Sequence, residues 1–196
     1  MASYRSATVY CSSSNEIDDV YTDAATQLGE LFAAHHVQLV NGGGSVGLMG
    51  VMARSVHTHG GRVVGVIPHA LKSIEGVAYL ASDELILTDT MRERKRIMYE
   101  RSDGYVAMAG GYGTLEEFLE VLTLRKLGYH DKPIVLLNTN GFYDDMLVFF
   151  DKMTEAGFSR EPASQYFEVV TRPEEVLHTL GLGAVRSCAS SVGHEA

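Results

Sequence analysis

Short apolar runs alternate with longer mixed segments along the chain, and this alternation predicts strands that take turns with helices. Mostly apolar runs of strand length occupy residues 7–11, 37–40, 62–67, 85–87, 105–108, 134–137 and 167–170. In the segments between them, apolar residues recur every three or four positions, as on a helix with one buried face. Strands that are apolar on both faces are typical of a parallel sheet, because helices cover both of its sides.

The pattern therefore predicts an α/β fold with a Rossmann-like parallel sheet covered by helices on both faces. The chain has 196 residues, of which 45% are hydrophobic and 21% charged, as expected for one globular domain. We assign residues 1–182 to that domain. Small and polar residues dominate after Gly181, so we expect residues 183–196 to form a disordered tail.

Net charge and cysteine content narrow the class of partner. The formal charge of -9 at pH 7 argues against binding to nucleic acid or to a membrane surface, because phosphate groups require a basic footprint. Cys11 and Cys188 are far apart and lack the spacing of a zinc site or a disulfide framework. No stretch has the pattern of a membrane span or a signal peptide, so we expect a soluble, cytoplasmic protein.

The second predicted strand runs into a glycine-rich strand-to-helix turn at residues 41–50. Gly42, Gly44 and Gly47 match the dinucleotide-binding pattern G-x-G-x-x-G. NAD is disfavoured, because its ribose needs an acidic residue about 20 positions later, and residues 31–74 contain no Asp or Glu. Arg62 keeps an NADP-dependent oxidoreductase as an alternative.

A serine-rich loop, residues 12–15, follows the first predicted strand. Its serines either cap the next helix or contribute to a ligand site, because open α/β sheets bind ligands beyond the carboxyl ends of their strands. Ser13 in this loop, with Gly43 and Gly44 in the glycine-rich turn, are therefore candidate substrate contacts.

Another glycine-rich turn, Ala-Gly-Gly-Tyr-Gly-Thr-Leu-Glu-Glu at residues 109–117, lies between a predicted strand and a predicted helix. Glycine lets the backbone approach a ligand closely and point several N–H groups at it. We expect Thr114 to open the helix, whose positive dipole end suits an anion. The turn lacks the Gly-Lys-Ser/Thr ending of ATP-type loops, so it predicts a phosphate site without Mg²⁺-triphosphate chemistry.

Glu117 has two interpretations. In Thr114-x-x-Glu117 it matches a capping box, in which its carboxylate only accepts a hydrogen bond from the Thr114 backbone N–H. Alternatively, the carboxylate lies beside a bound phosphoester and acts on a sugar or a water. The local pattern by itself slightly favours the capping box.

Four basic residues crowd about two turns of a predicted helix at residues 91–99, in a chain that is otherwise acidic. Such a run is commonly a solvated face. The helix directly precedes the strand that leads to the second glycine-rich turn, so it can instead place Arg94 and Lys95 opposite that turn. Arginine binds phosphate through two parallel hydrogen bonds, which fits this second interpretation.

Other chemistries find little support in the sequence. The eight histidines form no metal-binding pattern, and no Gly-x-Ser-x-Gly elbow of a serine hydrolase occurs. Lys95 would need a buried, desolvated environment to act as a Schiff-base lysine, and its neighbours do not indicate one. We therefore expect neither a metal nor an organic cofactor.

Three motifs become specific when they are taken together. They are Gly-Gly-Gly-Ser-Val-Gly-Leu-Met-Gly at residues 42–50, Met-x-x-Arg-Lys at residues 91–95 and Gly-Gly-Tyr-Gly-Thr-Leu-Glu-Glu at residues 110–117. In that order they resemble the LOG (LONELY GUY) family of cytokinin riboside 5′-monophosphate phosphoribohydrolases, over a stretch from about Val9 to Val170. The resemblance implies a Rossmann-like homodimer that hydrolyses the N-glycosidic bond of a nucleoside 5′-monophosphate, giving an adenine-type base and ribose 5-phosphate.

The resemblance also assigns roles to residues. Arg94 and Glu117 match the family's catalytic arginine and glutamate. Positions that match nucleotide contacts are Glu75, Arg94, Lys95, Gly110, Gly111, Tyr112, Gly113, Thr114, Leu115, Glu116 and Thr123. Ala109 stands where the motif has proline, which leaves the chemistry possible, and Ser12 stands where the first loop has glycine, which bears on substrate choice.

Glycosidic cleavage passes through an oxocarbenium-like sugar, so an anionic group near the ribose can stabilise the charge and orient or deprotonate water. Glu117 is the candidate for that group, with Arg94 holding the substrate. The main alternative is a sensor or carrier of the same fold, which would bind AMP-like ligands without releasing a base.

Overall fold

The computed structural model describes residues 5–74 and 77–182, and a seven-stranded parallel sheet lies at its centre. The strands are β1 (Arg5–Tyr10), β2 (Val37–Asn41), β3 (Val63–Pro68), β4 (Glu84–Thr88), β5 (Gly104–Ala107), β6 (Ile134–Leu137) and β7 (Glu168–Val170). Their order across the sheet is β4-β3-β2-β1-β5-β6-β7, and each neighbouring pair is parallel. The predicted α/β class is confirmed, whereas the predicted tail at 183–196 lies outside the described residues.

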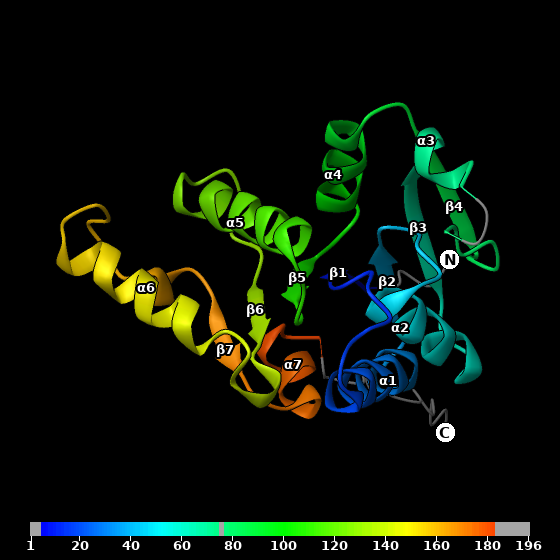
Figure 1. The fold of residues 1–196 in the computed structure, drawn as a ribbon, viewed down its shortest axis with the longest axis horizontal. Helices are drawn as coiled ribbons and strands as arrows, with labels where there is room; N and C mark the ends of the chain where they lie inside the picture. Colours follow the sequence, from blue (N-terminus) through cyan, green and yellow to red (C-terminus); the bar gives the residue numbers. More distant parts are fainter. Residues whose placement is uncertain (1–4, 75–76, 183–196) are drawn as a thin grey trace, which may run out of the picture.

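Helices cover both faces of the sheet. They are α1 (Asp19–Ala34), α2 (Gly47–Thr58), α3 (His69–Lys72), α4 (Met91–Glu100), α5 (Tyr112–Lys126), α6 (Asp144–Glu155) and α7 (Pro173–Thr179), with 3₁₀ turns η1 (Thr139–Gly141) and η2 (Ala163–Gln165). Figure 1 shows α1, α2 and α7 on one face and α4 and α5 on the other. Phe32 and Met52 lie in the buried core of the first face, and Met98 and Phe118 in that of the second.

Strand β5 illustrates why the strands of this sheet are continuous apolar runs in the sequence. Tyr105 and Ala107 belong to the core beneath α4 and α5, whereas Val106 belongs to the core on the opposite face. Successive side chains of a strand point to opposite faces, so a strand covered on both sides needs apolar residues at every position.

Helix α6 agrees with the prediction only in part. The sequence pattern places Met146, Phe149, Phe150 and Met153 on an inward face, and Met146 and Phe150 are partly buried against the core on the α4 and α5 side. Phe149 instead is 57% exposed, and no residue of α6 is fully buried. The helix flanks the short edge strand β7 at one end of the sheet (Figure 1). One chain therefore covers only part of its apolar surface.

None of the helices in residues 5–74 and 77–182 is long and apolar enough to cross a membrane. The same part of the chain holds no group of three or more His, Cys, Asp or Glu side chains that could bind a metal ion. Cys11 is buried, and burial raises the pKa of its thiol far above the ordinary value, which disfavours the reactive thiolate.

Candidate active site

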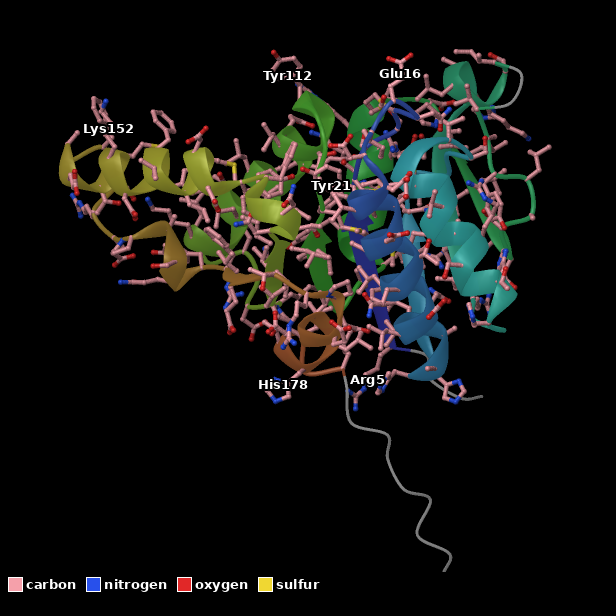
Figure 2. The ribbon with its side chains drawn as sticks, turned by 60° about the horizontal axis from the view of Figure 1, so that its bottom comes forward. Arg5, Glu16, Tyr21, Tyr112, Lys152 and His178 are labelled. Carbon is pink, nitrogen blue, oxygen red and sulfur yellow. The ribbon has the colours of Figure 1, made fainter. Side chains whose placement is uncertain are left out.

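The strand order reverses at β1, which pairs with β2 on one side and with β5 on the other. The carboxyl ends of β1 and β5 therefore border the crevice in which open α/β sheets bind ligands. The backbone N–H of Ser12, just past β1, donates to the carbonyl of Ala109, just past β5 (3.1 Å). In Figure 2, Arg5 at the start of β1 lies at the bottom, whereas Glu16 and Tyr112, which follow β1 and β5, lie at the top.

The glycine-rich turn after β2 packs its backbone against the serine-rich loop. Gly43 (φ +71°) and Gly47 (φ +59°) adopt the left-handed conformation that favours glycine. A Cβ on Gly47 would lie 2.5 Å from the backbone carbonyl carbon of Ser13. The Gly47 N–H donates to Asn15 Oδ1 (2.8 Å). Glycine at position 47 therefore serves the close approach of two segments of this chain.

Arg94 of α4 lies against the same turn. Its Nε donates to the Val66 carbonyl near the carboxyl end of β3 (3.1 Å), and only 9% of its side chain is exposed. A Cβ on Gly42 would lie 1.7 Å from Arg94 Nη2, so the guanidinium occupies the space that glycine leaves. The interpretation of the basic run as a solvated face is wrong for Arg94.

Helix α5 begins earlier than the sequence predicts. Gly111 has extended backbone angles and is the N-cap, and Tyr112 is the first helical residue. Thr114 is therefore inside the helix and buried, packed so closely beneath Gly110 that a Cβ there would lie 2.2 Å from Thr114 Oγ1. The predictions that Thr114 opens the helix and that Thr114 and Glu117 form a capping box are wrong, because the extended Gly111 moves the helix start two residues back.

Glu117 instead faces the guanidinium of Arg94. Its Oε1 lies 4.0 Å from Arg94 Nη2, and 11% of its side chain is exposed. This separation exceeds a hydrogen bond, so both groups keep hydrogen-bonding capacity for a third group. Burial raises the pKa of Glu117 to about 7, although Arg94 opposes the shift. The carboxyl group can therefore exchange a proton near neutral pH.

Lys95 holds a second set of charges beside this pair. Its Nζ contacts Glu116 and lies 3.0 Å from Glu120 Oε2. Burial by itself would lower the pKa of Lys95, but its hydrogen bonds to the two carboxylates raise that pKa above the ordinary value. The ammonium group stays protonated, which does not suit a Schiff-base lysine.

The start of α5 is open to a ligand. A Cβ on Gly111 or Gly113 would meet no atom within 4 Å, and the first turn of α5 carries no acidic residue. Tyr112 projects away from the ribbon and is 93% exposed (Figure 2). The first N–H groups of a helix lack partners within the helix, and the dipole is positive there. This end of α5 therefore suits an anion such as a phosphate group.

Known proteins resemble this chain over most of its length. A family model described as "Possible lysine decarboxylase" matches residues 49–180. The "Probable cytokinin riboside 5'-monophosphate phosphoribohydrolase LOGL2" of Oryza sativa subsp. japonica is 42% identical over 177 residues, which cover 90% of this chain and 72% of the relative. The cytokinin riboside 5′-monophosphate phosphoribohydrolase LOG5 of Arabidopsis thaliana is 41% identical over 179 residues, which cover 90% and 77%. The chain belongs to the LOG family.

Solved structures similar to this LOG-family chain are more distant in sequence. The molybdenum cofactor carrier protein of Chlamydomonas reinhardtii is 23% identical with a TM-score of 0.69, covering 91% of this chain and 97% of that protein. A molybdenum cofactor binding protein of Rippkaea orientalis is also 23% identical, with a TM-score of 0.66 and coverages of 91% and 96%. At such identities the similarity establishes the fold alone.

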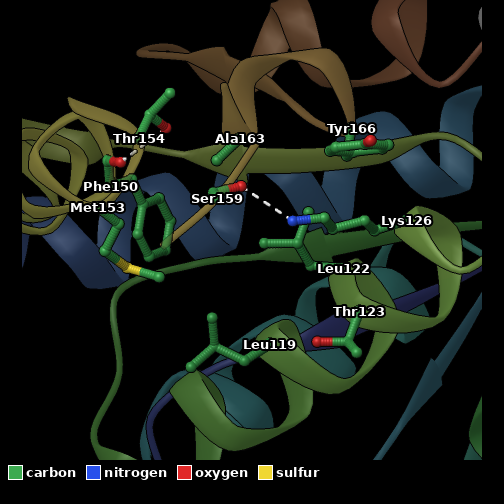
Figure 3. A pocket seen from close by; sticks show the side chains of 10 residues that line it. All are labelled: Leu119, Leu122, Thr123, Lys126, Phe150, Met153, Thr154, Ser159, Ala163 and Tyr166. Carbon is green, nitrogen blue, oxygen red and sulfur yellow. Dashed lines mark hydrogen bonds between the residues drawn. The ribbon is translucent and has the colours of Figure 1, made fainter. Parts of the chain in front are cut away.

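Not every residue that matches a LOG-family contact lies near Arg94 and Glu117. Thr123 is exposed and lies in a groove between α5 and α6, about 13 Å along the helix axis from Thr114 (Figure 3). Leu115 packs against the core beneath α5. Glu75 lies outside the described residues. The substrate-contact roles of these three residues stay predictions.

Ser13, Gly43 and Gly44 do lie at the carboxyl edge of the sheet. Ser13 is exposed on its loop, and the backbone of Gly43 and Gly44 pairs with the connection between β3 and β4. Arg62, in contrast, precedes β3 at the amino end of the sheet. A strand's length therefore separates it from the glycine-rich turn, which gives the NADP alternative no structural support.

Sequence reasoning missed two groups that hold the arginine of this LOG-family site. Gly42 belongs to the first glycine-rich motif, but its proximity to Arg94 could not be inferred, because the two residues are about 50 positions apart in the sequence. The Val66 carbonyl is a backbone group and leaves no signal in the sequence.

Proposed function

We propose that the chain hydrolyses the N-glycosidic bond of cytokinin riboside 5′-monophosphates, releasing an adenine-type base and ribose 5-phosphate. The observation that carries the proposal is the buried pair of Arg94 and Glu117, 4.0 Å apart at the carboxyl edge of the sheet, with a carboxyl pKa of about 7. Relatives named for this activity, at 41% and 42% identity, support it.

The two side chains can divide the reaction between them. Ionised Glu117 stabilises the positive charge that develops at C1′ and accepts a proton from the attacking water. The water oxygen bonds to C1′ as the bond from C1′ to the base nitrogen breaks, and the base leaves with that electron pair and takes up a proton. The Arg94 guanidinium donates hydrogen bonds to the substrate and offsets its negative charge.

The start of α5 suits the 5′-phosphate of such a substrate. Glu117 lies five residues beyond Tyr112, about 7.5 Å along the helix axis. Helical side chains lean toward the N-terminus, so the carboxyl group faces the ribose of a nucleotide whose phosphate is anchored there. Binding energy from the phosphate then positions C1′ for attack.

Base release from a small panel of substrates tests the proposal. The panel is N6-isopentenyl-AMP, AMP and their nucleosides, with free base measured by chromatography. We expect base from the monophosphates and none from the nucleosides, because the nucleosides lack the anchoring phosphate. Tight binding of nucleotide without base release would favour the sensor alternative, and a change in NADPH fluorescence on mixing would favour the oxidoreductase.

The pH dependence of kcat should follow the ionisation of Glu117. Burial raises the pKa of Glu117 to about 7, and only its ionised form can accept a proton from water, so we expect kcat to rise as the pH increases through about 7. The measurement is kcat at saturating N6-isopentenyl-AMP between pH 5 and pH 9. A kcat that falls as the pH rises through 7 would rule out this role for the carboxylate.

The apolar surface around α6 suits a second copy of the chain. Val148 and Phe149 are 67% and 57% exposed. The adjoining groove between α5 and α6 is lined in part by Leu119, Leu122, Phe150 and Met153 (Figure 3). Apolar surface of this kind marks protein interfaces, so we propose a homodimer through this face. The homodimer and a cytoplasmic location both stay predictions.

Sedimentation velocity tests the homodimer. We expect a dimer for the wild type at micromolar concentration and a shift toward monomer for Phe149→Lys, because a charge would be buried in the apolar interface. Asp151→Ala, on the side of the same helix opposite Phe149, is the matched surface substitution and should remain dimeric. A monomeric wild type would refute the proposed assembly.

A further inference from the structure

The connection between β3 and β4 is attached to the glycine-rich turn after β2. The Tyr79 N–H donates to the Gly43 carbonyl (2.8 Å), and the Ser45 N–H donates to the Val77 carbonyl (2.8 Å). An isolated antiparallel bridge lies between these two hydrogen bonds. We call residues 77–83 the strap. Because the same turn contains Gly42, the strap is attached to the backbone on which the Arg94 guanidinium rests.

His57, in the last turn of α2, holds the strap by two side chains. Its Nδ1 lies 2.8 Å from the Tyr79 hydroxyl and its Nε2 lies 2.9 Å from Asp83 Oδ2. The rings of His57 and Tyr79 also stack, with centroids 5.5 Å apart. The ring can make both hydrogen bonds whether it is neutral or charged, because a tyrosine hydroxyl can either donate or accept.

Asp83 fixes the other end of the strap to the sheet. Its Oδ2 accepts a hydrogen bond from the Val63 N–H at the start of β3 (2.8 Å). Burial by itself would raise the pKa of Asp83, but the hydrogen bonds from Val63 and His57 hold that pKa below its ordinary value, so the acceptor is a carboxylate. The histidine is therefore held in one orientation while it contacts Tyr79.

We propose that His57 is a positioning residue for base release: through Tyr79 it fixes the turn at residues 42–44, and through that turn it sets Arg94 opposite Glu117. This inference rests on the proposed function. The connection from Tyr79 to Arg94 is short. The Tyr79 N–H holds the Gly43 carbonyl, and a Cβ on the preceding residue, Gly42, would lie 1.7 Å from Arg94 Nη2. A displacement of about 1 Å at a catalytic group can cost about 100-fold in rate.

Three variants test the inference: His57→Ala, Tyr79→Phe and the double variant. Tyr79→Phe keeps the ring stack and removes only the hydroxyl. We expect each single variant to lower kcat about 10-fold with KM within about twofold. The double variant should have a kcat no lower than that of His57→Ala, because both substitutions remove the same hydrogen bond between His57 and Tyr79.

His59→Ala is the matched control. His59 ends the same helix, but its Nδ1 lies 2.9 Å from the Ser55 carbonyl and its Nε2 lies 3.7 Å from Glu30, away from the strap. It should keep the wild-type kcat. Equal kcat values in His57→Ala and His59→Ala, or additive losses in the double variant, would overturn the inference.

The pH profile of kcat separates positioning from a general loss of stability. The charged groups that act on Glu117 are Arg94 and Lys95 from α4 and Glu116 and Glu120 from α5, and Arg94 lowers its pKa most. A displaced Arg94 therefore moves the acid limb of the profile to higher pH in His57→Ala. If His57→Ala only lowers the melting temperature, the acid limb of its kcat profile stays at the wild-type pH. That result would overturn the inference.

Hydrogen exchange provides a readout that needs no turnover. A peptide covering residues 41–49 contains the Ser45 N–H that the strap protects. Faster exchange in Tyr79→Phe but not in His59→Ala supports the attachment, and equal exchange in both overturns it. A wild type that releases no base would instead refute the proposed function itself, so the two failures are distinguishable.

Discussion

Replacing Glu117 by glutamine is expected to lower kcat by about 100- to 10,000-fold, the range that a general base contributes. Glutamine is nearly isosteric with the carboxyl group, which is buried and lies 4.0 Å from Arg94 Nη2. It can neither accept a proton from water nor stabilise the developing charge at C1′. Base release from N6-isopentenyl-AMP measures the loss, and full turnover in the variant would remove Glu117 from catalysis.

The variant should fold at least as well as the wild type at alkaline pH. Burial raises the pKa of Glu117 from 4.5 to about 7, so the stability that its protonated form contributes is complete below about pH 4.5 and is lost as the pH rises through 7. Glutamine removes this dependence. We therefore expect a melting temperature at pH 8 no lower than that of the wild type. Glu100→Gln, in the exposed pair of Arg96 and Glu100 on α4, is the control that should keep full activity.

Arg94→Ala is expected to lower kcat by at least about 100-fold, because it removes the donors that offset charge on the substrate. Arg94→Lys should recover only part of the activity, since an ammonium group cannot reproduce the planar fork of the guanidinium. Arg94→Ala removes the positive charge that lowers the pKa of Glu117, so it should raise that pKa further and move the acid limb of kcat to higher pH. Wild-type kinetics in Arg94→Ala would place Arg94 outside the site.

Two further variants separate the position of the guanidinium from its charge. Gly42→Ala leaves Arg94 in the chain but puts a methyl group into its place, 1.7 Å from Nη2, and should resemble Arg94→Ala in kcat. Arg96→Ala, on the same helix, removes an exposed arginine that lies 3.1 Å from Glu100. Exposed pairs contribute little, so this control should keep wild-type activity and stability.

The sheet could be predicted from the sequence because burial on both faces leaves a continuous signal. In β5, Tyr105 and Val106 belong to cores on opposite faces, so the whole strand has to be apolar. The surroundings of α6 could not be predicted, because the helical period of its apolar residues is the same whether its own chain or another surface covers them. Phe149 carries that period and yet is 57% exposed.

The proposed catalytic residues, Arg94 and Glu117, could be named from motifs, but their environment could not be predicted. Thr114 and Glu117 have the spacing of a capping box, and only the extended backbone of Gly111 decides where the helix begins. The pKa of Glu117 depends on burial beside Arg94, a contact that exists only in the folded chain. Short sequence motifs describe residues that are neighbours along the chain. The site, in contrast, joins segments from four strand ends and two helices.

The decisive measurement for the role of Glu117 is the amount of free base that the wild type and Glu117→Gln release from N6-isopentenyl-AMP at pH 8. We expect equal amounts of base and ribose 5-phosphate from the wild type. From the variant we expect less than about 1% of that rate, with nucleotide binding retained in both. Equal base release by the two proteins would contradict the claim that the buried carboxylate carries the reaction.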